Sequence, residues 1–414
     1  MTAAVRWGRG TPYRASVYAG LFGLTALIGY FGPLGFALLA ALGGLLIAPV
    51  ALRLRRPAPE WLALAALAIW AAATLLWSPI TPTLSAEGYG ELERNTAAKL
   101  GLQLAVYGLL VAGATRLSVA AAQRALWVLS AGLLLWAVLL LGDGFSGGRV
   151  WSALTDVVGV ETTLQFREKK AAEGAYVLAV LAWPAAGFLW SKGWRAPALA
   201  IIAGTAVGAA GLSAFSVVAA LLAGGVALLL VGQGRSTGAL TLGLLFAVAL
   251  VVAPLIALEG ARSGLFEAAR DRLTASWAAR TDIWAFAAER IAEQPLRGWG
   301  LDASRTFGLS IPLHPHDAPL QLWLELGLVG VVIAMAFWFL LARRLAAMAD
   351  VSPSAAATAA ASAAAYFTVG ALSFGVWQEW WLAAGAVAWA ACAAHAIVRA
   401  SEEAELEQTG LPRV

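Results

Sequence analysis

The sequence is dominated by long apolar stretches, each close to the length that an α-helix needs to cross a lipid bilayer. Hydrophobic residues make up 61% of the chain and charged residues only 13%, which leaves too little polar surface to cover the cores of a soluble protein. Backbone N–H and C=O groups in lipid must find partners within their own segment, so these stretches predict helices and not open strands. The predicted spans are 16–31, 33–52, 61–77, 99–114, 124–141, 173–190, 197–211, 214–232, 239–257, 318–341, 355–373 and 376–398. The predicted fold class is therefore all-α, a polytopic membrane protein with about 12 transmembrane helices.

The distribution of Lys and Arg gives these spans an orientation, because the cytoplasmic loops of membrane proteins carry an excess of both. With a cytoplasmic N-terminus, the inside loops receive Arg6, Arg9, Arg14, Arg53, Arg55, Arg56, Arg116, Arg124, Lys192, Arg195, Arg235, Arg343, Arg344 and Arg399. The short outside turns near residues 32, 212 and 375 carry no Lys or Arg. Both termini are therefore predicted to be cytoplasmic, and the first apolar stretch is predicted to remain as an uncleaved helix.

Three predicted outside segments are long and charged. They are 78–98, 142–172 and 258–317. Long loops cross the membrane largely regardless of charge, so their Lys and Arg residues do not contradict the topology. In the largest, Trp277, Arg280 and Trp284 recur at helical spacing, which predicts an amphipathic helix that suits the membrane interface. The predicted organisation is spans one to nine over 1–257, the large outside loop over 258–317, spans ten to twelve over 318–398 and a cytoplasmic tail over 399–414.

Two histidines stand directly before the tenth span, in the stretch HPHDAPLQLWLELGLVG. His316 is followed by Asp317, nine residues and then Gly327-Leu328-Val329-Gly330. This stretch resembles the signature of the O-antigen ligase family, which is a His, then Asn, Ser or Gln, nine residues and a G-x-x-G-like end. Upstream, RTDIW (280–284) and PLRGWGLDASR (295–305) resemble the family's approach to its large periplasmic loop. Asp317 departs from the pattern, because the family usually has an amide or a hydroxyl there.

The resemblance implies a reaction, partners and a location. In this family a glycan carried on undecaprenyl diphosphate moves to an acceptor hydroxyl at the periplasmic face of the bacterial inner membrane, and the lipid diphosphate is released. The acceptor is lipid A-core for a ligase and the end of another glycan for a polymerase, and the fit of the motif favours the ligase. The expected partners are the lipid-linked glycan, the acceptor and membrane lipids, with no nucleic acid. No cofactor is expected, and the chain lacks the GxxxxGK[ST] phosphate loop.

This reaction requires a base for the acceptor hydroxyl and cations for the diphosphate. A diphosphate leaving group needs fixed positive charge, and the forked guanidinium of arginine suits phosphate oxygens. Arg280 matches the family's loop arginine and is the first candidate, followed by Arg305 and Arg297. The ordinary pKa of histidine, near 6.5, leaves the ring mostly neutral at pH 7, so His316 is the candidate base or acceptor-orienting residue. The alternatives are an exposed arginine on an amphipathic helix and an interfacial histidine that caps the next helix.

Further polar residues around the motif complete the candidate substrate site. His314, His316 and Asp317 lie within four residues, an awkward geometry for a metal site, and no metal is predicted. Asp317 is assigned the N-cap of span ten or an orienting partner of His316. Gln321 and Glu325 extend one face of span ten from His316, and Glu325 must face protein or water because a carboxylate in lipid is costly.

A second cationic cluster, Arg167, Lys169 and Lys170, comes just before the sixth span. In relatives of the family an Arg is expected directly before the glycine that opens GAYVLAVLAWP, and this chain has Glu173 there. The cluster either supplies the missing charge to the diphosphate or holds the helix end at the membrane interface.

A transporter or flippase of a lipid-linked oligosaccharide is the alternative function. It predicts charges or broken helices near the bilayer midplane. The predicted spans are nearly free of ionisable residues, and the charges gather at the outer face. A scaffolding membrane protein would leave the loop arginines and His316 without a role, so a glycan transferase is the predicted function.

Overall fold

The structure, a computed structural model, describes residues 10–51, 58–80, 95–157, 159 and 163–409, and every structural statement below refers to these. Within this part of the chain every regular element is helical, so the all-α fold class is confirmed. The arginines at positions 6, 9, 53, 55 and 56, and most of the segment 78–98, lie outside the described residues.

The predicted spans all fall on helices of the structure. The longer helices are α2 (Gly10–Phe31), α3 (Phe36–Ala51), α4 (Pro59–Thr74), α6 (Thr96–Ala114), α7 (Val119–Ser146), α10 (Ala175–Ser191), α11 (Arg195–Gly211), α12 (Phe215–Arg262), α14 (Ala275–Glu293), α15 (Ala318–Val351), α16 (Pro353–Leu372) and α17 (Glu379–Thr409). Short elements lie between them: η1 (Pro33–Gly35), α8 (Arg149–Asp156), α9 (Leu164–Glu173), α13 (Leu265–Arg270), η2 (Ala303–Thr306) and η3 (Gly308–Ser310).

Seven helices of the described chain are long and apolar enough to cross a membrane, and three shorter apolar helices accompany them. A multi-pass membrane protein is therefore confirmed, while the number of spans stays a prediction. One reason is α12, which contains two predicted spans, 214–232 and 239–257, on either side of a sharp bend at Arg235, where φ is 48°.

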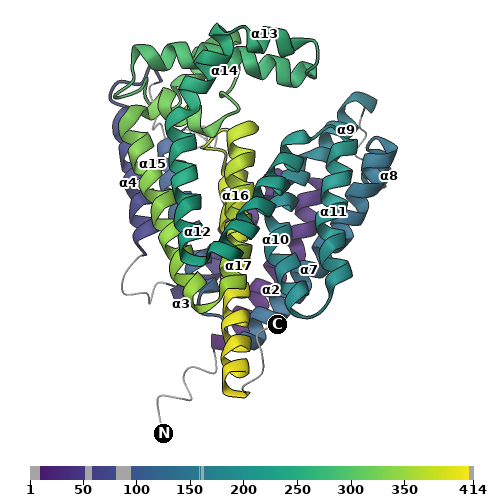
Figure 1. The fold of residues 1–414 in the computed structure, drawn as a ribbon. Helices are drawn as coiled ribbons and strands as arrows, with labels where there is room; N and C mark the ends of the chain where they lie inside the picture. Colours follow the sequence, from purple (N-terminus) through teal and green to yellow (C-terminus); the bar gives the residue numbers. More distant parts are fainter. Residues whose placement is uncertain (1–9, 52–57, 81–94, 158, 160–162, 410–414) are drawn as a thin grey trace.

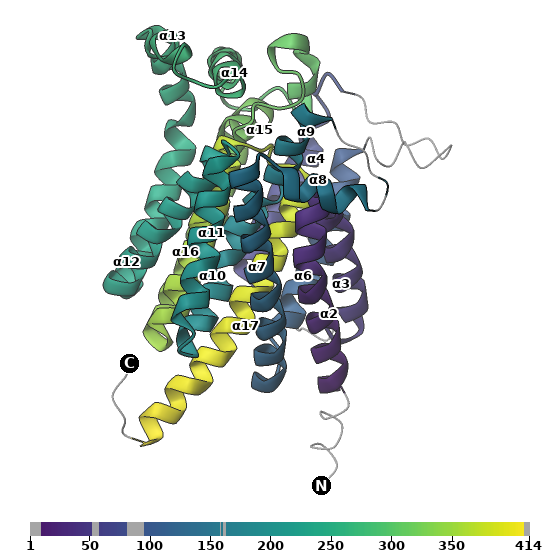
Figure 2. The ribbon, with the colours of Figure 1, turned by 90° about the vertical axis from the view of Figure 1, so that its right-hand side faces the viewer.

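The long helices stand side by side in one bundle (Figures 1 and 2). Helices α13 and α14, from the predicted outside loop, lie at one end of this bundle, and α8 and α9 lie toward the same end. Helix α2 begins and α17 ends at the opposite end. The segments 142–172 and 258–317, predicted as long loops, thus contain short helices, and the predicted tail from 399 continues α17 as far as Thr409.

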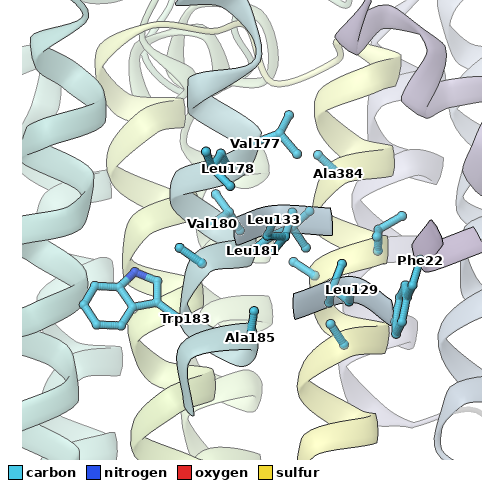
Figure 3. Close-up of a cluster of buried hydrophobic side chains, with 14 of the residues drawn as sticks. Phe22, Leu129, Leu133, Val177, Leu178, Val180, Leu181, Trp183, Ala185 and Ala384 are labelled. Atoms are coloured by element: carbon cyan, nitrogen blue, oxygen red, sulfur yellow. The ribbon is translucent and has the colours of Figure 1, made fainter. Parts of the chain in front are cut away.

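Helix α10 forms the centre of the largest hydrophobic cluster. It is apolar on all sides, as expected of a helix that neighbours surround, and 12 of its 17 residues are buried. Figure 3 shows its Leu181 beside Leu133 of α7, and both belong to this cluster. Helix α10, which begins directly after α9, is therefore fixed by its contacts in the core. The end of α9 is attached to this buried helix.

Small residues allow the helices to approach closely, as is common in membrane bundles. A Cβ placed on Gly144 of α7 would lie 2.7 Å from the Cα of Gly208 of α11, a distance that no real side chain tolerates. Glycine at these two positions is therefore required by the helix contact.

Candidate functional site

The two histidines of the motif meet in the short loop that precedes α15. Their ring centroids lie 4.3 Å apart, and the backbone N–H of His316 donates to Nδ1 of His314 at 3.1 Å. His316 has a φ of 56°, in the left-handed region that few residues other than glycine adopt, so the loop holds it in a strained backbone conformation. The sequence placed these rings two residues apart, and this backbone conformation brings them together.

One hydrogen bond determines which nitrogen of His316 carries the proton. Nδ1 lies 3.0 Å from the backbone oxygen of Ser373, at the end of α16. A carbonyl oxygen only accepts, so Nδ1 carries the hydrogen and Nε2 keeps its lone pair. Burial lowers the pKa of His316, and the nearby charges of Arg280 and Lys169 lower it further against the raising effect of the Ser373 carbonyl. The ring is therefore neutral at pH 7, with Nε2 able to accept a proton.

His314 is buried and holds the backbone of His316 through a hydrogen bond. Its Nδ1 accepts from the N–H of His316, and its Nε2 lies 3.0 Å from Nε2 of the Gln378 side-chain amide. Burial, followed by the charges of His316, Arg305 and Arg280, lowers the pKa of His314 to about 3. Its neutral ring holds the backbone of His316 in place.

Arg280 reaches the same place from α14. Its Nη1 donates to the backbone oxygen of Leu372 at 2.9 Å, and the guanidinium lies over the Trp277 ring with its carbon 5.0 Å from the centroid. Tyr176, near the start of α10, acts on the guanidinium to raise its pKa. Burial lowers the pKa of Arg280, but the ordinary value for arginine is so far above 7 that the group stays charged.

Helix α14 is tied directly to the histidine loop. Trp284, one turn along from Arg280, donates its indole N–H to the backbone oxygen of Pro315 at 2.9 Å. Ser216 of α12 shares a hydrogen bond of 2.7 Å with the hydroxyl of Ser373. Three helices thus hold the loop around His316, and Figure 1 shows α14 above the end of α16.

Asp317 forms the predicted N-cap of α15. Its Oδ1 accepts from the backbone N–H of Leu320 at 2.8 Å, and Pro319 occupies the first turn, where a missing N–H costs nothing. The carboxylate is therefore used by the helix end, and Nδ1 of His314 by a backbone N–H, so these groups do not converge as ligands on a metal.

Asp317 also gives a testable pH dependence. Burial raises its pKa from 3.8 to about 7, against the lowering effect of the Leu320 N–H. A group whose folded pKa lies above its unfolded pKa stabilises the fold at low pH and loses this contribution as pH rises between the two values. We expect wild-type Tm in detergent to fall between pH 4 and pH 7 by more than that of Asp317→Asn, which keeps a capping side chain that does not titrate.

The matched control for this prediction is Asp271→Asn, because Asp271 is exposed. Asp317→Ala removes the cap and should cost about 1 kcal/mol at any pH. The same pH dependence of Tm in wild type and Asp317→Asn would show that Asp317 does not have a raised pKa.

Gln321 and Glu325 lie inside a buried hydrogen-bond network. Glu325 is fully buried and accepts from the Ser304 hydroxyl at 2.6 Å, the Trp377 indole at 2.6 Å, the Gln321 amide at 3.0 Å and the backbone N–H of Asp302 at 3.1 Å. The oxygen of the Gln321 amide accepts from the N–H of Val376 at 2.9 Å. Glu325 therefore faces protein, as predicted. Together, Gln321 and Glu325 connect the loop that contains Ser304 to the turn that contains Val376 and Trp377.

The first glycine of the motif marks a break in α15. Gly327 has a φ of 63°, and the segment Pro295–Gly300 pairs with the freed backbone there: Trp299 N–H donates to Leu324 O and Gly300 N–H to Glu325 O, both at 2.8 Å. A Cβ on Gly327 would lie 2.5 Å from the nitrogen of Gly298. Gly327 is thus needed because the segment 295–300 packs against it. Its place in the sequence motif gave no sign of this contact.

The remaining predicted cations divide into two groups. Arg305 lies close enough to lower the pKa of His314, and Lys169 of α9 does the same for His316. In contrast, Lys170 pairs with Glu173 at 3.0 Å, Arg297 lies exposed over the Trp77 ring, and Arg167 packs beside the turn at Gly148. The charges of Arg280, Lys169 and Arg305 thus act on the histidines, whereas Lys170, Arg297 and Arg167 have their contacts elsewhere.

Sequence reasoning missed the partners on the turn between α16 and α17. This turn supplies the Leu372 and Ser373 carbonyls and the Gln378 amide, and Gly375 packs so closely that an added Cβ would lie 2.9 Å from the His314 ring. Backbone carbonyls carry no residue signature. The only feature of the sequence near residue 375 was the lack of Lys and Arg. This lack indicated the orientation of the turn in the membrane and gave no sign of partners for the histidines.

Comparisons with known proteins cover the same region. Residues 198–335 match the family model described as O-antigen ligase, and this range contains both Arg280 and His316. A protein of Rickettsia conorii named "Putative polysaccharide ligase" is 29% identical over 124 residues, 27% of this chain and 30% of that protein. Proteins of the same name from Rickettsia felis and Rickettsia bellii are 30% identical over 125 residues (27% of this chain, 30% of the relative) and 31% identical over 122 residues (26% and 29%).

The chain thus spans about 30% of the length of the curated relatives it matches. No solved structure matches it. The resemblance to the O-antigen ligase family, first seen in the histidine motif, is confirmed over residues 198–335.

Proposed function

From the O-antigen ligase domain at residues 198–335, we propose that the protein is a membrane glycosyltransferase that moves a glycan from a lipid diphosphate to an acceptor hydroxyl. The observation that carries the proposal is the neutral His316 ring, held through its Nδ1–H by Ser373, with Nε2 free to accept a proton and two cations nearby. A base beside fixed positive charge is what this transfer requires.

In the proposed reaction, the acceptor hydroxyl gives its proton to Nε2 of His316 while its oxygen attacks the anomeric carbon of the first donor sugar. A new bond forms between this carbon and the acceptor oxygen. The bond from the carbon to the phosphate oxygen breaks, and its electron pair leaves with the lipid diphosphate. The proton on His316 then passes to the diphosphate or to water, which restores the neutral ring, and the balance needs no co-reactant.

Arg280 and Lys169 are proposed to bind the departing diphosphate. Their charges, on α14 and α9, both lower the pKa of His316, and the Leu372 carbonyl orients the Arg280 guanidinium. Lys169 then supplies the charge that the family's arginine would bring at the position of Glu173, whose own charge is paired with Lys170. A preorganised pair of cations stabilises charge that develops as the bond breaks.

The other predicted residues take lesser roles in this proposal. Arg305 belongs to the acceptor side, beside His314. Arg297 and Arg167 are left to contact lipid headgroups. Asp317, Gln321 and Glu325 act as positioning residues, because their polar atoms bind the helix end and the neighbouring loops.

We place the site at the periplasmic face of the bacterial inner membrane, with both termini in the cytoplasm and undecaprenyl diphosphate as the donor lipid. Two observations support this placement. The Lys and Arg distribution puts the end where α2 begins and α17 ends inside, and α14 lies at the other end (Figure 2). Lipid A-core is proposed as the acceptor ahead of a growing glycan, because the curated relatives are named as polysaccharide ligases.

The test is reconstitution of the purified full-length protein in proteoliposomes with undecaprenyl-diphosphate glycan and lipid A-core. The expected product is a ladder of ligated glycolipids on a gel, which forms equally well with and without a chelator. Movement of the lipid-linked glycan across the vesicle with no transfer would favour a flippase. Extension of the lipid-linked glycan itself would favour a polymerase.

A further inference from the structure

A pocket with a volume of about 200 Å³ is lined by His314 and, in the described part of the chain, by no residue of α14, the helix that carries Arg280. The start of α6, the loop around η2 and the turn between α16 and α17 all contribute to its wall. His314 itself lines the pocket, and its ring centroid is 4.3 Å from that of His316. A molecule in this pocket therefore contacts His314, whose ring lies beside that of the proposed base.

The charges around the pocket cancel in pairs. Lys99 and Glu379 form an ion pair with a separation of 2.5 Å, and Arg305 and Asp302 one of 3.4 Å. Each cation in the lining thus has an anion beside it, and His314 is neutral. Arg280, in contrast, donates to the Leu372 carbonyl and lies over the Trp277 ring, so neither of these partners cancels its charge. The pocket suits a polar ligand without net charge, and Arg280 suits a diphosphate.

Two tryptophans, Trp377 and Trp380, add aromatic surface to this polar lining. The Trp377 ring is fixed because its N–H donates to Glu325 at 2.6 Å. A sugar ring has apolar C–H faces and a rim of hydroxyl groups, so it matches a wall that combines rigid aromatic rings with hydrogen-bonding side chains. The small volume selects a single sugar unit from a longer glycan.

Gln378 supplies a further hydrogen-bonding group. One end of its amide meets Nε2 of His314, and the other is buried without a partner in the described part of the chain. An unpaired buried polar atom is costly, and a ligand hydroxyl or a water relieves that cost.

We propose that this pocket binds one sugar unit of the acceptor, while Arg280 and Lys169, which do not line it, bind the donor diphosphate. The inference rests on the proposed function and adds the place where the acceptor binds. The two substrates then contact different residues, so the neutral acceptor never has to displace the charged donor from Arg280. A larger apolar cavity of about 510 Å³ shares Trp377 with the pocket, which gives a lipid chain attached to the acceptor sugar apolar space inside the bundle.

The kinetic test uses a substitution that adds a bulky side chain at the edge of the pocket. Leu313 lines the pocket and is 47% exposed, so Leu313→Trp adds bulk there with little effect on the core. We expect the acceptor KM to rise roughly tenfold or more, with the donor KM unchanged. The matched control is Leu309→Trp, because Leu309 lies on the same loop, is 97% exposed and does not line the pocket. An unchanged acceptor KM in Leu313→Trp would overturn the inference while leaving the transferase function intact.

A binding test works even if no transfer is detected, so it separates failure of the inference from failure of the proposed function. The chain has one cysteine, Cys392, which is buried, and wild type gives the background of maleimide labelling. Leu313→Cys adds a reactive site at the pocket, and Leu309→Cys adds one away from it. Lipid A-core in nanodiscs should slow labelling at position 313 alone, and undecaprenyl diphosphate should not. No protection by lipid A-core, or protection by undecaprenyl diphosphate, would overturn the assignment.

Discussion

His316→Asn is expected to reduce glycan transfer by about 10²- to 10⁴-fold, the usual contribution of a general base. Asparagine tolerates the left-handed backbone at this position, where φ is 56°, better than alanine does. Its amide can still donate to the Ser373 carbonyl, but it cannot take a proton as Nε2 does. The measurement is the initial rate of ligated product formation in proteoliposomes at saturating donor and acceptor.

The pH profile supplies the check that the loss is chemical and not structural. The base must be unprotonated, and burial lowers the pKa of His316 below its ordinary value of 6.5. We therefore expect the wild-type rate to be constant from pH 7 to 8 and to fall only as pH drops below 6.5. The residual rate of His316→Asn should lack this fall, and its Tm should match wild type. A variant that keeps more than a tenth of the wild-type rate and the same pH profile would rule out His316 as the base.

Arg280→Ala is expected to lower the rate of transfer by roughly 10²- to 10³-fold, as for loss of one preorganised group that stabilises developing charge. The guanidinium is half-buried and held by the Leu372 carbonyl, so its charge acts where water screens it less. The same variant should bind the released undecaprenyl diphosphate more weakly, which product inhibition of wild type and variant compares directly. Arg280→Lys should recover part of the rate, because it keeps the charge but not the fork.

The control for this prediction is Arg272→Ala, an exposed arginine on the turn that precedes α14. It should transfer glycan at the wild-type rate. If Arg280→Ala lowers Tm and Arg280→Lys restores Tm without restoring the rate or product inhibition, the contact with Leu372 is structural and the diphosphate binds elsewhere. Equal product inhibition in Arg280→Ala and wild type would contradict the proposed role directly.

Hydrophobicity alone was enough to predict the long apolar helices of this protein. A segment in lipid must satisfy its own backbone hydrogen bonds, so an apolar stretch of sufficient length has one regular structure open to it. The helix pattern at Trp277, Arg280 and Trp284 was also readable, because its period depends on local geometry only. The N-cap at Asp317 was predictable for the same reason: it involves residues three positions apart.

The internal breaks were harder to predict than the helices. Nothing in the apolar sequence around Gly327 indicates that α15 breaks there, because the cause is the approach of residues 295–300 from an earlier part of the chain. The extension of the helical face from His316 correctly suggested that Gln321 and Glu325 lie together. Their polar atoms, however, meet Ser304, Trp377 and Val376, none of which is near them in sequence.

The sequence by itself determined the fold class and predicted His316 and Arg280 as the candidates for the proposed chemistry. Both conclusions depend on properties that each residue or short segment carries with it: hydrophobicity, period, charge and proton affinity. Only the tertiary structure decided that the charge of Lys169 acts on His316 while Lys170 pairs with Glu173, that Ser373 sets which ring nitrogen is free, and that a pocket of balanced charge lies beside His314. These features depend on carbonyl groups and side chains brought together from distant segments, and hydrogen bonds to a backbone carbonyl leave no trace in residue identity.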